Sequence, residues 1–471
     1  MTLTFEEKAT QYYSEVCVNK GLVRKAGLGL RSIPMYVNEW IVSRHAPDSN
    51  LDDAARQKMQ DFINKHLPSK DHKERLKARL QQGESLLILD EYSVEIDLKT
   101  NDRILRIPCL DEKKSGIESH IIQNYPLLLG SGVWGVAKLE YQPPNEDLRL
   151  PGRIYMVDFR PMQAANIDIE LFCEQRQYFS LAEWRDLLVS SMGYNPSFYS
   201  PEQQMLLITR LIPIVQERVN LIELAPKGTG KSFVYLNLSR HVRLISGGKV
   251  TAAVLFHNNA TNQSGLLTQF NVVVFDEAQT LSFDNPGEIV GVLKDYLESG
   301  RFSRGGKQQS SATAGIVILA NIPLDADGHP RFSNLFLNLP EFLRETAFID
   351  RIHGILPGWK LQRIQETAIS NNIGFKADFL GEVLHTLRQR AGYTEYVTTY
   401  GQILGTKDVR DRNAIERLAA GYLKLLFPDL KVSREELVEY CLRPAASLRQ
   451  RVRDQLAEID PEFKRVMIEV A

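Results

Sequence analysis

Hydrophobic and polar positions divide this chain of 471 residues into stretches of different period. In the first stretch, apolar residues recur every three to four positions, for example from Leu51 to Leu67, which is typical of amphipathic helices. From Ser85 to about Met162 the period falls to two and turn residues intervene, so we expect about four or five short strands. Between residues 200 and 365 strands and helices alternate, as in a mostly parallel sheet. After Trp359 the pattern is helical.

These changes of pattern predict the domain organisation. We expect a helical N-terminal region, a small β domain, a helical bridge, an α/β domain, a helical lid and a helical tail. Their expected boundaries are residues 1–82, 83–165, 166–200, 201–365, 366–430 and 431–471. The small β domain is of the kind that carries oligonucleotide-binding (OB) folds. The alternative is a structural β domain that only spaces or oligomerises the chain.

Composition narrows the classes of protein that fit. With 43% hydrophobic and 24% charged residues, the chain is globular, which excludes wholesale disorder. Its 57 Lys and Arg nearly balance its 58 Asp and Glu, so a polyanion would have to be bound by local basic patches. The four cysteines form no CxxC pair, which argues against a zinc ribbon or a disulfide framework. Without a signal peptide or a long apolar run, we expect a cytoplasmic protein with no membrane partner.

The clearest motif is an apolar strand, Leu221 to Ala225, followed by a glycine-rich loop and a helix. The loop and the helix start read Pro226, Lys227, Gly228, Thr229, Gly230, Lys231 and Ser232. The two glycines let backbone amides surround phosphates, the second lysine neutralises the β and γ phosphates, and the serine hydroxyl binds Mg²⁺. Ala225 replaces the usual first glycine, and an alanine can often still make that turn. We therefore expect a P-loop that binds ATP and Mg²⁺.

Further motifs complete a hydrolytic site. The apolar strand from Asn271 ends in Asp276, expected to join Ser232 in ordering Mg²⁺, and Glu277, expected to polarise the attacking water. A third apolar strand ends in Asn321, which would orient that water. Arg351 stands where an arginine finger would enter the site of a neighbouring subunit. A turn asparagine and a surface arginine are the alternatives for these last two residues.

The order of these motifs resembles the AAA+ ATPases, and more closely the Lon and MCM helicase branches. The resemblance implies an MCM-like ring with a helical lid that carries a second sensor arginine, for which Arg410 is our first choice and Arg417 our second. A charged helix face is the alternative for this helix.

The same resemblance implies a contact with DNA. A helix, a basic turn and a strand follow Leu293 in the order seen in the pre-sensor hairpin of MCM-type motors. That hairpin would place Arg301, Arg304 and Lys307 against the phosphate backbone. The mildly basic N-terminal region adds a weaker candidate DNA surface, which includes Lys70, Lys73 and Lys77. A basic loop at subunit contacts and a solvated helix face are the alternatives.

Most of the chain resembles the BrxL family, the Lon-like AAA+ proteins of BREX phage-defence systems. The segments that carry the resemblance are 21–25, 33–37, 226–232, 294–300, 348–353, 355–359 and 424–428. The resemblance implies a DNA-binding ATPase that acts on double-stranded phage DNA, assembles as hexamers that can stack into dodecamers, and works with other BREX proteins. Family members usually continue into a Lon-protease-like domain. We find no Ser–Lys pair in a protease-type context after the lid, so we expect no protease activity.

Three functions therefore compete. The first is an ATP-driven DNA-binding ring that acts as a helicase-like motor or a clamp. The second is an ATP-driven protein remodelling factor, a Lon-like unfoldase without protease activity, although the sequence shows no aromatic pore loop for threading a substrate. The third is an assembly factor in which nucleotide only holds subunits together. We rank them in this order.

Overall fold

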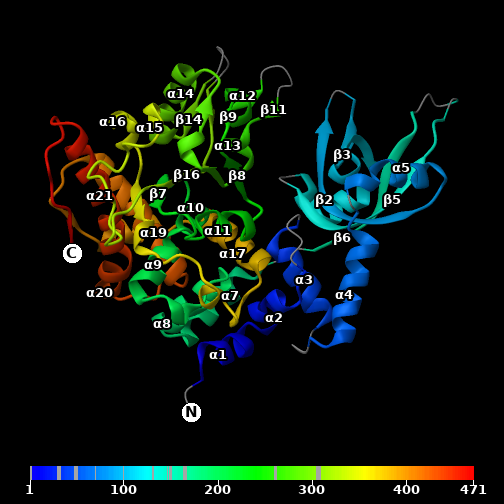
Figure 1. Ribbon diagram of the computed structural model, residues 1–471, viewed down its shortest axis with the longest axis horizontal. Helices are drawn as coiled ribbons and strands as arrows, with labels where there is room; N and C mark the ends of the chain where they lie inside the picture. The colour runs from blue at the N-terminus through cyan, green and yellow to red at the C-terminus, as the bar shows by residue number, and fades with distance from the viewer. Residues whose placement is uncertain are drawn as a thin grey trace. The chain divides into compact units, whose positions relative to one another are not determined.

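The chain forms two compact units (Figure 1). The computed structural model describes residues 3–28, 33–46, 51–68, 70–98, 100–129, 132–145, 147, 151–162, 167–258, 263–303 and 309–471. The first unit, here the α/β unit, comprises residues 1–17, 168–375 and 380–471, and the second, here the barrel unit, comprises residues 18–167 and 376–379. Residues 1–17 and 168–200 therefore belong to the same compact unit as the predicted P-loop.

Five strands of the barrel unit close into a barrel in the order β2-β3-β4-β6-β5. They are β2 (Leu86–Asp97), β3 (Asp102–Ile107), β4 (Glu112–Ile117), β5 (Val133–Gln142) and β6 (Arg153–Pro161). Only β4 and β6 pair in parallel among these neighbours, and α6 (Ser119–Asn124) joins β4 to β5. Alternate side chains such as Tyr92, Leu105 and Met156 fill the interior. The period of two thus correctly predicted these strands, because each strand buries one face.

Helices precede the barrel, as their period predicted. They are α2 (Lys20–Lys25), α3 (Met35–His45), α4 (Asp53–His66) and α5 (Lys73–Gln81). The Asp52 carboxylate accepts a hydrogen bond from the Ala55 amide at 2.7 Å and so caps α4. A buried ion pair between Lys20 and Glu39, 2.5 Å apart, fixes α2 against α3, because a buried charge without its partner is costly.

The α/β unit is built on a sheet of five parallel strands in the order β17-β7-β16-β12-β8. They are β17 (Gly354–Pro357), β7 (Leu221–Ala225), β16 (Gly315–Asn321), β12 (Val272–Asp276) and β8 (Val242–Ser246). The central strands are apolar along their whole length because both faces of a parallel sheet are covered. On one face, α14 (Pro286–Ser299) buries Leu293 and Leu297 in the core. All strands run the same way, so the sheet has one carboxyl edge and one amino edge.

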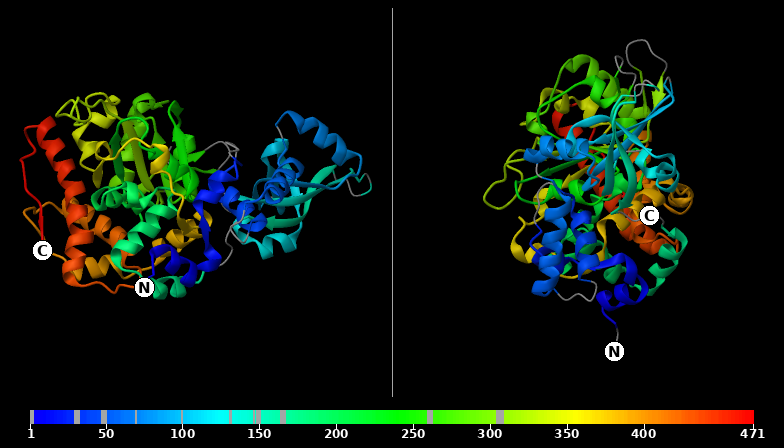
Figure 2. Two further views of the ribbon diagram at one scale, coloured as in Figure 1. Left: turned by 60° about the horizontal axis from the view of Figure 1, so that its bottom comes forward. Right: turned by 90° about the vertical axis from the view of Figure 1, so that its right-hand side faces the viewer.

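The C-terminal part of the α/β unit is mainly helical, as predicted. Its longer helices are α17 (Ala377–Gln389), α18 (Tyr393–Tyr400), α19 (Val409–Leu426) and α21 (Arg443–Ile459). Figures 1 and 2 show α21 beside α19, and α21 also packs against β17. In the described part of the chain, no helix combines the length and apolarity that a membrane crossing requires.

The start of the chain packs onto the helical bridge. Figures 1 and 2 show α1 (Phe5–Tyr12) next to α8 (Leu181–Ser191), and Lys8 pairs with Glu183 at 2.7 Å. The Ser180 hydroxyl accepts a hydrogen bond from the Glu183 amide, and the Glu183 carboxylate accepts one from the Ser180 amide. This reciprocal pair confirms the capping box that the sequence predicts at the start of this helix.

Candidate functional site

The predicted P-loop joins β7 to α11 (Lys231–Asn237) at the carboxyl edge of the sheet. Gly228 and Gly230 have φ angles of +86° and +72°, in the left-handed region that favours glycine. A Cβ atom at Gly230 would lie 2.4 Å from Ile364 Cδ1, so this position also excludes a larger residue by contact. The loop thus has the strand-loop-helix geometry in which backbone amides surround a polyphosphate.

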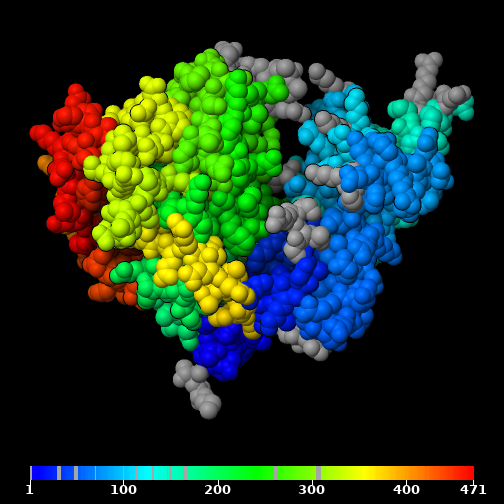
Figure 3. Space-filling view, viewed as in Figure 1, coloured from blue at the N-terminus to red at the C-terminus, as the bar shows by residue number. Residues whose placement is uncertain are grey.

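A surface segment after β17 lies against this loop. The Ile364 amide donates a hydrogen bond to the Gly228 carbonyl oxygen at 2.8 Å. The segment around Ile364, yellow in Figure 3, lies at the surface of the α/β unit. It forms one wall of the candidate nucleotide site, a feature that no sequence motif indicated.

The P-loop lysine contacts the residue predicted to orient water. Lys231 Nζ donates hydrogen bonds to Asn321 Oδ1 at 2.8 Å and to the Pro226 carbonyl oxygen at 3.1 Å. Burial lowers the pKa of Lys231, so its ammonium group gains free energy from a negatively charged partner such as a phosphate. Two residues that are 90 positions apart in the sequence thus meet because β7 and β16 are neighbours in the sheet.

The two predicted magnesium ligands also lie in contact. The Ser232 hydroxyl donates a hydrogen bond to Asp276 Oδ2 at 2.5 Å. A hydroxyl and a carboxylate are hard oxygen ligands of the kind that Mg²⁺ takes together with phosphate oxygens, so this pair fits the ion. Glu277 follows at φ +51° and is exposed at the same edge of the sheet. The carboxyl edge therefore gathers Lys231, Ser232, Asp276, Glu277 and Asn321.

A buried charge network beneath the P-loop was missed by the sequence motifs. Arg210 and Glu223 are 0% and 1% exposed, and their side chains pair at 2.7 Å. Arg210 also donates to the Thr229 carbonyl oxygen at 3.2 Å and to the Tyr194 hydroxyl oxygen at 3.0 Å, and the Tyr194 hydroxyl donates to the Gly230 carbonyl oxygen at 3.0 Å. Burial by itself lowers the pKa of Arg210, but the charge of Glu223 outweighs it and raises the pKa. The only sequence signal was a glutamate inside an apolar strand.

The predicted finger Arg351 lies at the opposite edge of the sheet. Gly354 pairs with Leu221 at the start of their strands, and the P-loop begins after Ala225 at the other end. Five residues of extended strand separate the two edges by roughly 15 Å. Arg351 therefore lies away from the P-loop of its own chain.

The first-choice sensor Arg410 lies beside Arg351. Arg410 is in the first turn of α19 and binds Glu298 at 3.0 Å and Asp350 at 2.6 Å, while Arg351 Nε lies 3.3 Å from the same Glu298. We call Glu298, Asp350, Arg351 and Arg410 the arginine cluster. The second-choice Arg417 is partly buried and lines the same cavity as these residues. It donates to the Arg218 carbonyl oxygen at 3.3 Å, and burial lowers its pKa.

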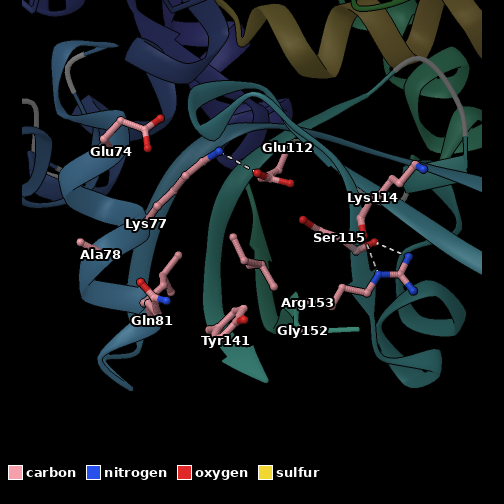
Figure 4. A pocket seen from close by; sticks show the side chains of 12 residues that line it. Glu74, Lys77, Ala78, Gln81, Glu112, Lys114, Ser115, Tyr141, Gly152 and Arg153 are labelled. Atoms are coloured by element: carbon pink, nitrogen blue, oxygen red, sulfur yellow. Dashed lines mark hydrogen bonds and ion pairs between the residues drawn. The ribbon is translucent and has the colours of Figure 1, made fainter. Parts of the chain in front are cut away.

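The predicted DNA-binding residues fall into two groups. Arg301 is exposed in β14 (Arg301–Phe302), which pairs with β15 (Ser310–Ser311) as a hairpin. Arg304, Lys307 and the side chain of Lys70 lie outside the described residues. Lys73 and Lys77 are each ion-paired with a carboxylate of the barrel, Asp111 at 3.1 Å and Glu112 at 2.7 Å. Figure 4 shows the Lys77 contact in an open pocket of about 420 Å³ between α5 and the barrel.

Comparisons with known proteins cover nearly the whole chain. The model described as "Lon-like protease BrxL-like, ATPase domain" matches residues 154–469, and the model described as "BREX system Lon protease-like protein BrxL N-terminal" matches residues 11–141. The Lon-like protease BrxL of Bacillus cereus (strain H3081.97) is 31% identical over 457 residues, which cover 96% of this chain and 66% of the relative. That of Escherichia coli O9:H4 (strain HS) is 31% identical over 453 residues, 95% of this chain and 64% of the relative.

A more distant similarity links part of the chain to a viral protein. The uncharacterized protein ORF426 of Acidianus filamentous virus 1 is 25% identical over 175 residues, 35% of this chain and 41% of the relative. The chain spans somewhat less than two thirds of the length of the BrxL relatives, at 66% and 64%.

Proposed function

Because the chain belongs to the BrxL family, we propose that it is an ATP-hydrolysing, DNA-binding ring protein of a BREX phage-defence system. The observation that carries the proposal is the meeting of Lys231, Asn321 and the Ser232–Asp276 pair at the carboxyl edge of the sheet. These are the groups that ATP hydrolysis needs, and they come from three neighbouring strands.

The proposed chemistry follows from these contacts. The P-loop amides and the Lys231 ammonium bind the phosphates, and Lys231 exchanges Asn321 for a phosphate oxygen. Ser232 and Asp276 would hold Mg²⁺, and the bound ion would supply positive charge next to the β and γ phosphates. Asn321, released from Lys231, is then free to orient the attacking water, and the exposed Glu277 carboxylate accepts its proton.

The opposite edge completes the site of a second subunit. Arg351 and Arg410 are about one strand length from the P-loop of their own chain, so we infer that they stabilise transition-state charge on the nucleotide of a neighbour. Such a head-to-tail contact generates a ring when the rotation between neighbouring subunits closes. A hexamer that can stack into a dodecamer, in the cytoplasm and together with other BREX proteins, is the assembly that the family resemblance implies.

Two features support DNA as the partner, and the family resemblance implies that this DNA is double-stranded. The hairpin of β14 and β15 presents Arg301 directly after the helix that ends at Ser299. The closed five-stranded barrel, in the order β2-β3-β4-β6-β5, supports the OB-like domain that we propose, in which β3 and β4 would form the face that contacts DNA. Contacts of these residues with the phosphate backbone would be independent of base sequence and sensitive to salt.

The test is ATP turnover by the purified chain with and without double-stranded DNA, with the size of the assembly measured under each condition. DNA-stimulated turnover in a ring-sized species is the expected result, and Glu277→Gln serves as the inactive control. Turnover that ignores DNA and rises with an unfolded protein would replace this proposal with ATP-driven protein remodelling. Assembly without turnover would support an assembly factor, in which the bound nucleotide only holds the subunits together.

A further inference from the structure

Glu298 lies between the two arginines that the proposed function assigns to the neighbouring site. Its two carboxylate oxygens share Arg410, with Oε1 3.2 Å from Nε and Oε2 3.0 Å from Nη2. Oε2 also lies 3.3 Å from Arg351 Nε. One carboxylate therefore links two guanidinium groups that come from different parts of the sequence.

The other charges of the arginine cluster explain why the Glu298 carboxylate is needed to hold Arg351 and Arg410 together. Asp350 binds Arg410 at 2.6 Å, but its other oxygen is 3.0 Å from the buried Arg449 of α21. Asp350 therefore shares its charge with a second arginine, and among the described residues only Glu298 pairs with both Arg351 and Arg410. The Glu298 hydrogen bond is the main cause that raises the pKa of Arg410. Without Glu298, two like charges would face each other and move apart.

The backbone around Glu298 is firmly placed. Glu298 is in the last turn of α14, and Gly300 ends that helix at φ +73°. The Arg218 side chain donates a hydrogen bond to the Glu298 carbonyl oxygen at 2.8 Å, and Arg218 precedes β7 at the amino edge of the sheet. The main chain of Glu298 is thus anchored next to the amino edge of the sheet.

Both arginines keep capacity for another partner. Arg351 Nε is buried and makes no well-aligned hydrogen bond, although Glu298 is close, and Arg351 Nη1 donates to the Ala347 carbonyl oxygen. The Arg410 side chain is 41% exposed. The cluster is therefore oriented by Glu298 and still able to bind an anion that approaches from outside.

We propose that Glu298 is a positioning residue for ATP hydrolysis, which holds Arg351 and Arg410 as one cationic pair directed at the nucleotide of a neighbouring subunit. This inference rests on the proposed function. It predicts that neutralising Glu298 slows the chemical step without weakening the binding of ATP, because the P-loop lies at the other edge of the sheet.

The test compares Glu298→Gln with Glu345→Gln. Glu345 is a matched control, because it pairs with Lys294 of the same helix at 2.7 Å and its side chain is 42% exposed, against 41% for Glu298. Glu298→Gln should lower kcat about tenfold and leave KM for ATP within about twofold. Glu345→Gln should change neither, and both variants should form rings and unfold at the wild-type temperature.

A double-mutant cycle separates the positioning of the two arginines by Glu298 from a general effect of the Glu298 substitution on activity. Adding Glu298→Gln to Arg351→Ala/Arg410→Ala should lower kcat no further, because the groups it positions are gone. A wild-type chain without ATP turnover would contradict the proposed function itself. Loss of turnover in Arg351→Ala together with a wild-type kcat in Glu298→Gln would overturn this inference alone.

Discussion

The polar side chains at the two edges of the parallel sheet differ in the partners that they find within one chain. At the carboxyl edge, Lys231 binds Asn321 and Ser232 binds Asp276, so groups from three strands already contact one another. At the amino edge, Arg351 and Arg410 share one partly exposed carboxylate, Glu298. The comparison teaches that the two sets of residues are separated by the length of a strand, and under the function we propose, a hydrolytic site that uses both sets takes one edge from each of two subunits.

The largest expected effect is at the carboxyl edge. Glu277→Gln should lower ATP turnover by about a thousandfold, because the amide is no base for the attacking water. Affinity for ATP should remain, since the P-loop and Lys231 are unchanged. Single-turnover kinetics together with equilibrium binding of a fluorescent ATP analogue measure the two effects separately. Near-normal turnover would remove Glu277 from the chemistry.

The next effect is at the amino edge. Arg351→Ala should lower turnover by about a hundredfold while ATP binding to the same chain stays within about twofold, because one group that stabilises transition-state charge is lost. Arg344→Ala is the control, since Arg344 ends the nearby helix α15 (Glu341–Arg344) outside the arginine cluster. Equal losses of binding and turnover in Arg351→Ala would show that the two edges are not separable as described.

A smaller effect distinguishes the two candidate sensor arginines. Arg410→Ala should lower kcat about tenfold without unfolding the chain, because Arg410 is partly exposed and its loss leaves Glu298 accessible to water. Arg417→Ala should instead lower the melting temperature, because this partly buried arginine bonds to the Arg218 carbonyl oxygen. Thermal unfolding and steady-state kinetics on both variants test the assignment. The reverse outcome would make Arg417 the functional residue.

The smallest effect concerns the buried network under the P-loop. Tyr194→Phe removes the hydroxyl that donates to the Gly230 carbonyl oxygen and should raise KM for ATP by about threefold to tenfold, with kcat nearly unchanged. Tyr199→Phe is the control, because the Tyr199 ring packs against Tyr194 at 5.9 Å without a hydrogen bond to the loop among the described contacts. A fall in kcat at constant KM would place Tyr194 in the chemical step.

Sequence reasoning found the features whose signal is local. The P-loop is contiguous in sequence, and Asp276 and Asn321 each end an apolar strand, so the parallel sheet had to gather them at one edge. The barrel strands followed from their period of two. The capping box at Ser180 needed only four residues.

Features that depend on contacts between residues far apart in the chain could not be predicted from the sequence. Tyr194 and Arg210 reach the P-loop only because the bridge and the helix that follows it fold beneath the loop, and neither residue belongs to a motif. The choice between Arg410 and Arg417 depends on which face of α19 meets Asp350 and Glu298. The role we infer for Glu298 depends on two arginines that follow it by more than fifty positions.

The most direct test of a hydrolytic site shared between two subunits mixes two inactive variants of the chain. Lys231→Ala lacks a working P-loop but keeps its arginines, whereas Arg351→Ala keeps its P-loop. If each site takes one edge from each of two subunits, an equal mixture should recover about a quarter of wild-type turnover, since one interface in four pairs two intact edges. No recovery, in a mixture shown by size to form joint rings, would contradict the account.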